Sequence, residues 1–228
     1  MKLSKHTLNM LKNFSDINMS IEIKKGNVLR TVSVQKNILA QAELEDEFPK
    51  DFAIYELNRF LGAASLFDDP EFEFNAKSTK IGTNTHSVDY VYCDPSMIVT
   101  PPENNITFPD PEVKFVLSQD ALSQVMRASN VLGTPEIAVA GGPAPADSIR
   151  IKALDVNNDS TDTFQVILDE SFSGDKFRFV FKTENMKMIP GNYDVEISSK
   201  GISHFTLQGQ KLEYWIATES TSNFGGSV

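Results

Sequence analysis

The strongest constraint on the fold is an approximate internal repeat. Residues 4–15 read SKHTLNMLKNFS and residues 118–129 read SQDALSQVMRAS, and the second block begins half of the 228-residue chain after the first. A looser match follows in each half, where a segment expected to hold a short helix (53–67, then 181–191) precedes alternating apolar and polar residues. These matches predict two similar domains, each running helix, strands, short helix, strands.

The weakest patterning lies between residues 95 and 111, which hold five prolines. Proline fixes φ and removes a backbone donor, so this segment is expected to be an extended connector outside any sheet interior. We therefore expect an N-terminal domain over 1–110 and a C-terminal domain over 111–228.

Alternation of apolar and polar residues dominates elsewhere. It is clearest in residues 21–34, 87–93, 176–181 and 212–218. A period of two is typical of strands with one face on a core and the other in water. The predicted class is α+β, with two domains of antiparallel sheet and helices on one face.

Charge and cysteine content narrow the class of protein. The chain carries 21 basic and 31 acidic residues, which gives a formal charge of −10. This charge argues against a protein that binds nucleic acid with its whole surface, but it leaves room for one basic face. The single cysteine, Cys93, allows no internal disulfide. No apolar run approaches the roughly 20 residues of a membrane span, and no signal-peptide core is present, so we expect a soluble cytoplasmic protein without a membrane partner.

Both repeat blocks are expected to form amphipathic helices. In the first, Ser4 is a candidate N-cap, and Leu8, Leu11 and Phe14 mark an apolar side. The opposite stripe carries Lys5, Asn9, Lys12 and Asp16, and the matching stripe of the second helix carries Gln119, Ser123, Arg127 and Asn130. A few cations on such a stripe are also what an ordinary solvated face shows; their recurrence in both repeats favours a functional surface.

Three blocks, MKLSKHTLNMLKNFSDIN, DFAIYELNRFLGAASLF and NMKMIPGNYDVEISSKG, resemble the corresponding blocks of the DNA sliding clamps of T-even-type bacteriophages. That resemblance implies a ring-forming homotrimer that encircles double-stranded DNA without sequence specificity and tethers the phage DNA polymerase. It further implies a clamp loader ATPase as a partner, no cofactor, and action in the cytoplasm of the bacterial host.

The resemblance also implies two sets of site residues. Cations of the inner helices face DNA, while the acidic stretches 43–47 and 68–73 are expected elsewhere on the surface. A groove near the connector and the last long strand receives a partner peptide. The DNA-facing candidates are Lys2, Lys5, Lys12, Arg59, Arg127 and Lys187, and the groove candidates are Val99, Ile106, Phe108, Trp215 and Ala217.

Catalysis and metal binding find no support in the sequence. No serine lies in a Gly-x-Ser-x-Gly turn, and Cys93 alternates with strand residues. The stretch from Asp155 resembles a calcium loop, but Ser160 and Val166 stand where glycine and glutamate are needed, so a turn is expected there. We expect a protein that is not an enzyme and holds no metal.

Two other classes of function remain open at this level. A β-rich structural or assembly protein, such as a virion component, would show the same repeat with its basic stripes merely solvated. An enzyme acting on a small molecule or glycan on a sandwich scaffold is the weaker alternative, because it lacks a catalytic constellation.

Overall fold

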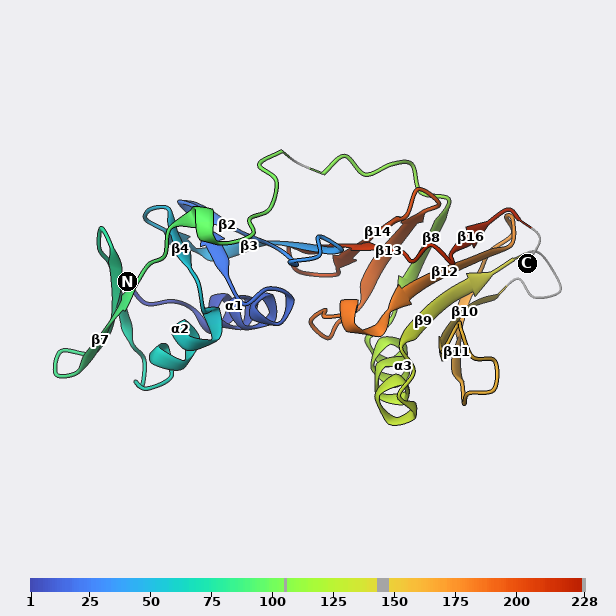
Figure 1. The fold of residues 1–228 in the computed structure, drawn as a ribbon, viewed down its shortest axis with the longest axis horizontal. Coiled ribbons are helices and arrows are strands. Elements are labelled where there is room, and N and C mark those ends of the chain that lie inside the picture. The colour runs from blue at the N-terminus through green and yellow to red at the C-terminus, as the bar shows by residue number, and fades with distance from the viewer. Residues whose placement is uncertain (105, 143–147, 227–228) are drawn as a thin grey trace. The chain divides into compact units, whose positions relative to one another are not determined.

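The computed structural model describes residues 1–104, 106–142 and 148–226, and the chain divides into two compact units, Met1–Asn105 and Ile106–Val228. Within each unit the described strands pair antiparallel, and helices accompany the sheets (Figure 1). The predicted α+β class with antiparallel sheets is therefore what the structure shows.

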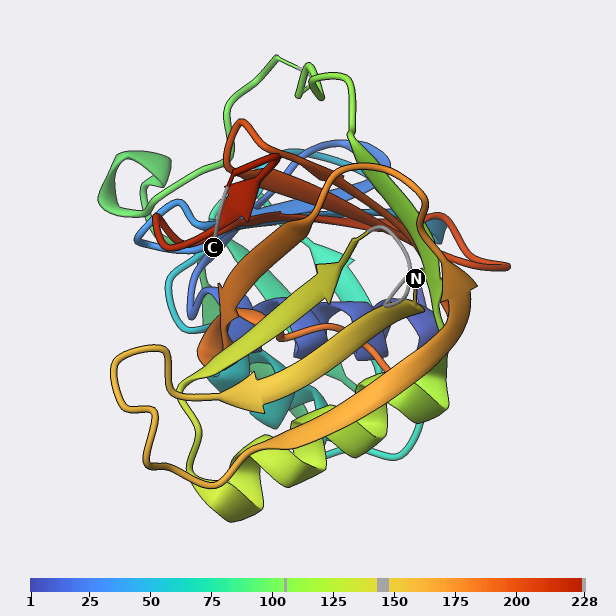
Figure 2. The same ribbon diagram turned by 90° about the vertical axis from the view of Figure 1, so that its right-hand side faces the viewer.

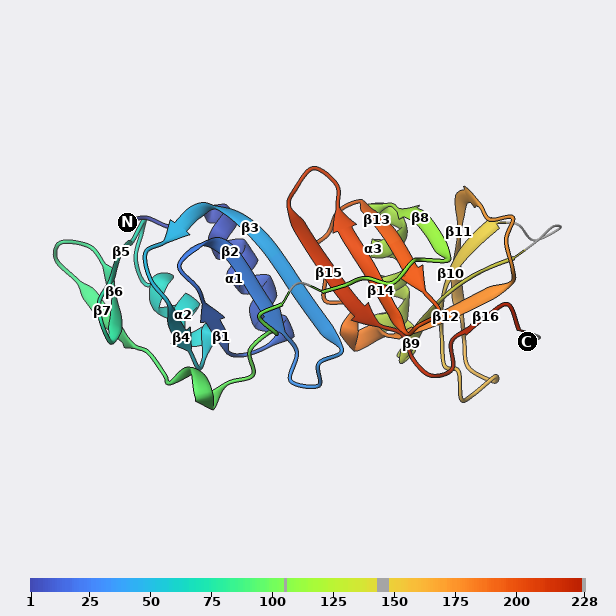
Figure 3. The same cartoon turned by 90° about the horizontal axis from the view of Figure 1, so that it is seen from above.

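The first unit contains two helices, α1 (Lys5–Ile17) and α2 (Leu57–Ala64), which pack against each other. Strand β1 pairs with β4, β2 pairs with β3, and β5, β6 and β7 form a three-stranded sheet in that order (Figure 3). The strands are β1 (Ile21–Ile23), β2 (Gly26–Val32), β3 (Ile38–Phe48), β4 (Phe52–Ile54), β5 (Glu71–Phe74), β6 (Ser78–Gly82) and β7 (Ser87–Val91).

The second unit contains one long helix, α3 (Gln119–Leu132), packed against β9, β10 and β11 (Figure 2). One sheet has the order β11-β10-β9-β12-β16, and the strands β15, β14, β13 and β8 follow one another in a second sheet. The strands are β8 (Val113–Leu117), β9 (Glu136–Gly141), β10 (Ser148–Leu154), β11 (Phe164–Ser171), β12 (Phe177–Lys182), β13 (Tyr193–Ser198), β14 (Ile202–Leu207), β15 (Leu212–Ala217) and β16 (Asn223–Phe224).

The internal repeat is confirmed at the helix starts. Ser4 caps α1 by accepting a hydrogen bond from the Thr7 amide at 3.1 Å, and Ser118 caps α3 by accepting one from the Ala121 amide at 3.2 Å. Each cap satisfies one of the amides that a helix start leaves without an intrahelical acceptor. The same local chemistry therefore starts the long helix of each unit.

The repeat also extends to the buried serines near the ends of these helices. The Ser15 hydroxyl lies 2.8 Å from the Asn58 side-chain oxygen of α2, and the Ser129 hydroxyl lies 3.0 Å from the Thr183 hydroxyl. Thr183 begins η2 (Thr183–Asn185), a single 3₁₀ turn. In each unit a buried polar contact thus joins the long helix to the short helical element that follows later in the chain.

The short helices are shorter than the sequence suggested. The first was expected within 53–67, but Ala53 and Ile54 belong to β4 and the helix begins at Leu57. The second was expected within 181–191, but only the turn η2 forms there, and Phe181 and Lys182 end β12. Pro190 disfavours helical backbone at the residue before it, which limits the space for a longer helix.

The proline-rich segment is an extended connector, as predicted. A single 3₁₀ turn, η1 (Pro95–Met97), opens it, and its remaining described residues up to β8 form neither helix nor strand. Asn18 and Arg30 hold its first part through bonds to the carbonyls of Val99 (3.4 Å) and Pro102 (2.8 Å).

Asp46 of β3 anchors the start of α1. A bulge between Gly26/Val28 and the facing part of β3 lets the Asp46 carboxylate accept hydrogen bonds from the Ser4 amide and the Thr7 hydroxyl, both at 2.7 Å. Burial by itself would raise the pKa of Asp46, but these hydrogen bonds outweigh it and the pKa is lowered. The carboxylate therefore contributes stability in its charged form.

We expect Asp46→Asn to lower the free energy of unfolding at neutral pH by about 1–2 kcal/mol, because it weakens two charge-assisted hydrogen bonds at a helix start. The contribution is present above the unfolded pKa of about 4 and is lost as the pH falls through the lower folded pKa. Urea unfolding followed by circular dichroism should show the two proteins converging below about pH 4. Glu45→Gln, at an exposed position of the same strand, is the control; an equal loss in this control would contradict the anchoring role.

Candidate nucleic-acid interface

The exposed stripe of α1 is the one that the sequence predicted. Lys5, Asn9, Lys12 and Asp16 are all exposed, whereas Leu11 and Phe14 are fully buried. Lys12 follows Lys5 by seven positions, which is about two helical turns and places both on one face about 10 Å apart along the helix axis. Among the described residues, neither lysine side chain has a carboxylate partner. Both charges are therefore directed at solvent and available to a polyanion.

Helix α3 presents one cation on its exposed face. Arg127 is exposed and has no ion pair within the described part of the chain, while Leu122 and Val125 face the core. Leu132, in the last turn of α3, is 39% exposed. Asp120 of the first turn accepts a hydrogen bond from the Gln124 side chain at 2.6 Å.

Lys2 and Arg59 already have carboxylate partners in the first unit. Lys2 pairs with Asp69, which raises the pKa of the lysine through a hydrogen bond, and Arg59 pairs with Glu56 at 3.3 Å. Exposed pairs of this kind contribute little to stability. They do neutralise the local field, so these two candidates add less attraction for phosphate than Lys5 and Lys12.

Lys187 is exposed and lies in the loop after η2, not on a helix. The six candidates thus come from different kinds of structure. Lys5 and Lys12 lie on α1, Arg59 on α2 and Arg127 on α3, whereas Lys2 and Lys187 lie in segments outside the helices. Within the first unit, Lys5 and Lys12 share one stripe.

The acidic stretches are not all remote from α1, contrary to the expectation. Glu43, Glu45 and Glu47 are exposed, but Asp46 binds the start of the helix and Asp69 pairs with Lys2. Side chains must satisfy the amides of the helix start, and carboxylates are favoured at its positive end. Acidic residues therefore border the first turn of α1.

Part of the predicted partner-peptide site comes together in the second unit. Trp215 of β15 stacks on His204 of β14, with ring centroids 4.8 Å apart and an angle of 7°, and Phe108 of the connector lies 5.5 Å from His204. Register explains the contact, since His204 faces Trp215 across the two strands. The Trp215 indole nitrogen is buried and has no hydrogen-bond partner among the described residues.

His204 is the residue that sequence reasoning missed. Its Nε2 lies 3.2 Å from a Glu213 oxygen and its Nδ1 lies 3.7 Å from a Glu196 oxygen. Lys114 on the next strand lies 2.6 Å from Glu196 and lowers the pKa of that carboxyl. The signal that could have found it is the alternation of apolar and polar residues in Ile202–Leu207, which puts His204 on the polar face; only strand pairing shows which residues it contacts.

The remaining groove candidates are half-buried and do not belong to the ring cluster of Phe108, His204 and Trp215 in the described structure. Val99 lies in the first unit, where its carbonyl accepts from Asn18, while Ile106 and Ala217 lie in the second. The structure therefore brings together Phe108 and Trp215 and adds His204 between them. It leaves the roles of Val99, Ile106 and Ala217 as predictions.

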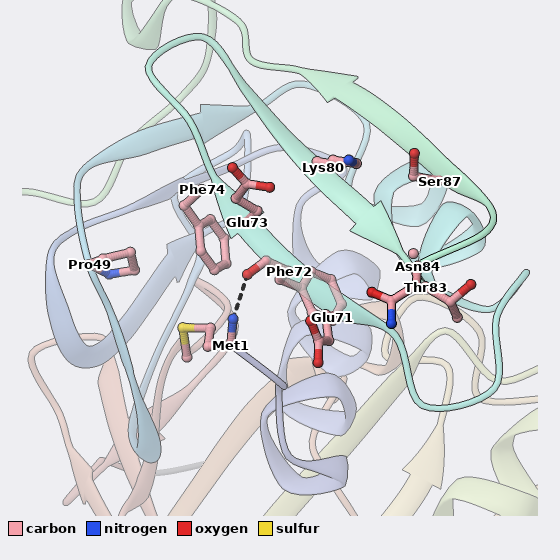
Figure 4. A pocket seen from close by; sticks show the side chains of 11 residues that line it. Met1, Pro49, Glu71, Phe72, Glu73, Phe74, Lys80, Thr83, Asn84 and Ser87 are labelled. Carbon is pink, nitrogen blue, oxygen red and sulfur yellow. Dashed lines mark hydrogen bonds between the residues drawn. The ribbon is translucent and has the colours of Figure 1, made fainter.

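The two larger cavities lie in the first unit, while a smaller one of about 300 Å³ in the second unit is lined by Lys114 and Glu196, next to His204. One of about 610 Å³ in the first unit is lined by β5, β6 and neighbouring residues, and the Met1 amino group there donates to the Phe72 carbonyl at 2.7 Å (Figure 4). A second of about 610 Å³ lies between β2 and the connector, next to Arg30. Neither holds a cluster of catalytic or metal-binding side chains.

Metal binding, a membrane-spanning helix and a nucleophilic thiol also find no support in the part of the chain that the structure describes. No three His, Cys, Asp or Glu side chains there are grouped to hold a metal, and no helix there is long and apolar enough to cross a membrane. Burial raises the pKa of the Cys93 thiol, which opposes a nucleophilic role. Residues 155–161 form turns in which Asp155 and Asn158 accept amide hydrogen bonds, as expected.

Solved structures show the same fold at low sequence identity. The PCNA of A. fulgidus, solved with the C-terminal region of FEN-1, aligns with a TM-score of 0.69 at 14% identity and covers 95% of this chain and 96% of its own. The β clamp of Helicobacter pylori aligns with a TM-score of 0.71 at 11% identity and covers 96% of this chain and 65% of its own.

Relatives found by sequence are more similar to this chain than these solved structures are. The family described as DNA polymerase processivity factor matches residues 2–99, and the family described as gp45 sliding clamp, C terminal, matches residues 114–220. The sliding clamp of Vibrio phage KVP40 is 35% identical over 96% of this chain and all of its own length, and that of Enterobacteria phage T4 is 32% identical over 97% and 98%. This chain therefore belongs to the sliding clamps of T4-like phages, the DNA polymerase processivity factors of phage DNA replication.

Proposed function

We propose that this sliding clamp encircles double-stranded DNA as a homotrimer and holds it through the exposed cations of α1 and α3. The two units would be the clamp domains, 1–110 and 111–228. The observation that carries the proposal is the recurrence of unpaired cations, Lys5, Lys12 and Arg127, on the exposed faces of two helices that begin with the same serine cap.

Weak attraction is the property that such a ring needs. Phosphate contacts have a steep salt dependence, and many tight contacts would resist movement along the duplex. A helix of 13 residues such as α1 is about 20 Å long, so lying across the grooves it cannot enter the major groove to read bases. Binding independent of sequence follows, and the cations act without catalysing any reaction.

The edge strands β7 and β11 are the proposed site of the subunit contacts in the trimer. Each forms one edge of its sheet within its unit, and each exposes a large apolar side chain: Val91 is 71% exposed and Ile167 is 56% exposed. An edge strand presents unpaired backbone groups that can pair with another chain. Different edges on the two units suit a head-to-tail contact, which closes into a ring when the rotation fits.

The DNA polymerase and a clamp loader ATPase are the proposed protein partners, in the cytoplasm of the bacterial host. The cluster of Phe108, His204 and Trp215 supplies an apolar surface beside the connector, with the buried Trp215 N–H as an unused donor. Aromatic anchors in such clusters commonly dominate the binding energy of protein interfaces. Val99, Ile106 and Ala217 are the further candidates for the wall of this site.

Replacing Lys5, Lys12 and Arg127 together by Glu should lower the fraction of clamp retained on nicked circular DNA by about tenfold or more, because the ring would repel phosphate. Retention after loading is measured by gel filtration, and wild-type clamp should run off the same DNA once it is linearised. All three side chains are exposed, so the molar mass in solution should not change.

The matched control is the triple replacement of the exposed Lys25, Lys80 and Lys200 by Glu, which changes the net charge equally. Equal loss in both variants would contradict a specific role for the helix cations. Equal retention of wild-type clamp on circular and linear DNA would contradict encirclement.

For the trimer, light scattering at moderate salt should give about three times the 25.3 kDa mass of one chain. Val91→Asp and Ile167→Asp should each shift the protein toward monomers, because a charge would be buried in the proposed contact. Leu66→Asp, at an exposed position in the turn after α2 and outside any strand, is the control. A monomer or dimer for the wild type would exclude the proposed trimer.

Trp215→Ala should weaken polymerase binding by about tenfold or more, because it removes an aromatic anchor and the ring that stacks on His204. Affinity is measured by calorimetry with the polymerase. Val116→Ala, on the same side of the same sheet, should leave the affinity unchanged. Unchanged polymerase binding by the Trp215 variant would place the partner site elsewhere.

A further inference from the structure

One face of the sheet β10-β9-β12 carries four cations that are not among the candidates for the DNA-facing surface. Register places three residues of each strand side by side on this face: Arg150, Ala140 and Arg178 form one row, and Lys152, Ala138 and Val180 form the next. Leu154, Glu136 and Lys182 form the third row. Figure 2 shows the three strands side by side. We call Arg150, Lys152, Arg178 and Lys182 the cationic strip.

The cations of the strip are half-buried and lack partners. Each is of intermediate exposure, and none makes a hydrogen bond or ion pair through its side chain within the described part of the chain. The Arg150 Nε is buried without an acceptor. Half-buried charges without partners are costly to a fold and are unusual in a chain whose formal charge is −10. They indicate a surface that is completed by an external acceptor.

The cations of the strip lie around a small buried apolar cluster. Ala138, Val180 and Leu154 on this face are at most 8% exposed and form that cluster, whereas Ala140, between Arg150 and Arg178, is partly exposed. Glu136, opposite Lys182, is buried and accepts a hydrogen bond from the Val156 amide at 3.2 Å, and the Glu219 amide donates to the Val180 carbonyl at 2.8 Å. Asp169 is exposed further along β11. The strip retains a net positive charge.

The strip is separate from the cations proposed to face DNA. Alternate residues of the same strands, including Ile137, Val139, Ile149 and Ile151, are buried on the other face of the sheet. Helix α3 packs against β9, β10 and β11, and its apolar residues must meet that apolar face. The sheet therefore lies between Arg127 and the strip, and one duplex cannot contact both.

Carboxylates of a protein fit the strip better than a single nucleic-acid strand does. Strand-binding surfaces need aromatic platforms for the bases, but Phe177, Phe179 and Phe181 of β12 are buried on the opposite face. Arginine forks match carboxylates through paired hydrogen bonds. Side chains two apart on a strand repeat at about 7 Å, which is the spacing of alternate side chains in an extended peptide.

We propose that the cationic strip is a docking site for an acidic extended segment of a partner protein. Arg150 and Arg178, on either side of Ala140, bind its carboxylates. Lys152 and Lys182 supply further charge. This site is separate from the cations proposed to face DNA and from the surface around Trp215. It borders the proposed subunit contact, because Arg150 lies opposite Ile167 of β11.

Fluorescence anisotropy of a fluorescein-labelled oligoglutamate peptide with the full-length clamp tests the proposal. Binding at low salt is expected and should weaken as salt is added, although the net charge of the clamp opposes it. The double variant R150Q/R178Q should bind at least about tenfold more weakly, and R150K/R178K should fall between the two because it keeps the charge without the fork. The double variant K25Q/K200Q changes the charge equally at exposed sites and should bind as the wild type does.

Each result decides the proposal. No binding by the wild type, or equal weakening in K25Q/K200Q, would overturn it. Binding of a labelled oligothymidylate that equals or exceeds that of oligoglutamate, and that is lost in R150Q/R178Q, would replace it by a nucleic-acid site. If R150Q/R178Q melts earlier than the wild type, K152Q/K182Q gives the same test without the buried Arg150 nitrogen, and unchanged peptide binding there would count against the strip.

Discussion

Burial of one stripe of each long helix is the interaction on which the rest of this structure depends. Leu11 and Phe14 of α1, like Leu122 and Val125 of α3, are removed from water by the strands around them. Because a helix has a period of 3.6 residues, fixing the buried stripe also fixes which residues remain outside. Lys5, Lys12 and Arg127 are exposed for this reason, and no separate device is needed to display them.

The local distribution of charged side chains matters more for this protein than its net charge does. A clamp with a formal charge of −10 still exposes unpaired cations on its long helices, while Lys2 and Arg59 are balanced by neighbouring carboxylates. Acids at the start of α1 serve the helix, as the hydrogen bonds of Asp46 show. The surface is therefore a set of local fields, and the cationic strip of the second unit is one of them.

The proposed sites lie where sheets and loops leave groups without partners among the described residues. Edge strands offer backbone groups, the connector brings Phe108 to His204, and Trp215 and Arg150 each keep a buried nitrogen without an acceptor in the described part of the chain. A rigid sheet positions each of these groups, so that its partner has little ordering to do on binding. Closing the ring, holding the polymerase and docking an acidic segment would use different parts of the same two units.

Local features of this protein were determined by its sequence. The caps at Ser4 and Ser118, the exposed stripe of α1 and the extended connector all depend on residues close together in the chain, and the structure confirms them. Alternation located the strands but not every buried position, because Val180 of β12 is fully buried although the alternation puts it on the face toward water. Only the tertiary structure decided the contacts of His204 with Trp215 and Phe108, the anchoring of α1 by Asp46 and the rows of the cationic strip. They depend on strand register, on a bulge and on contacts between distant segments, and a one-residue change of register would move every side chain to the other face.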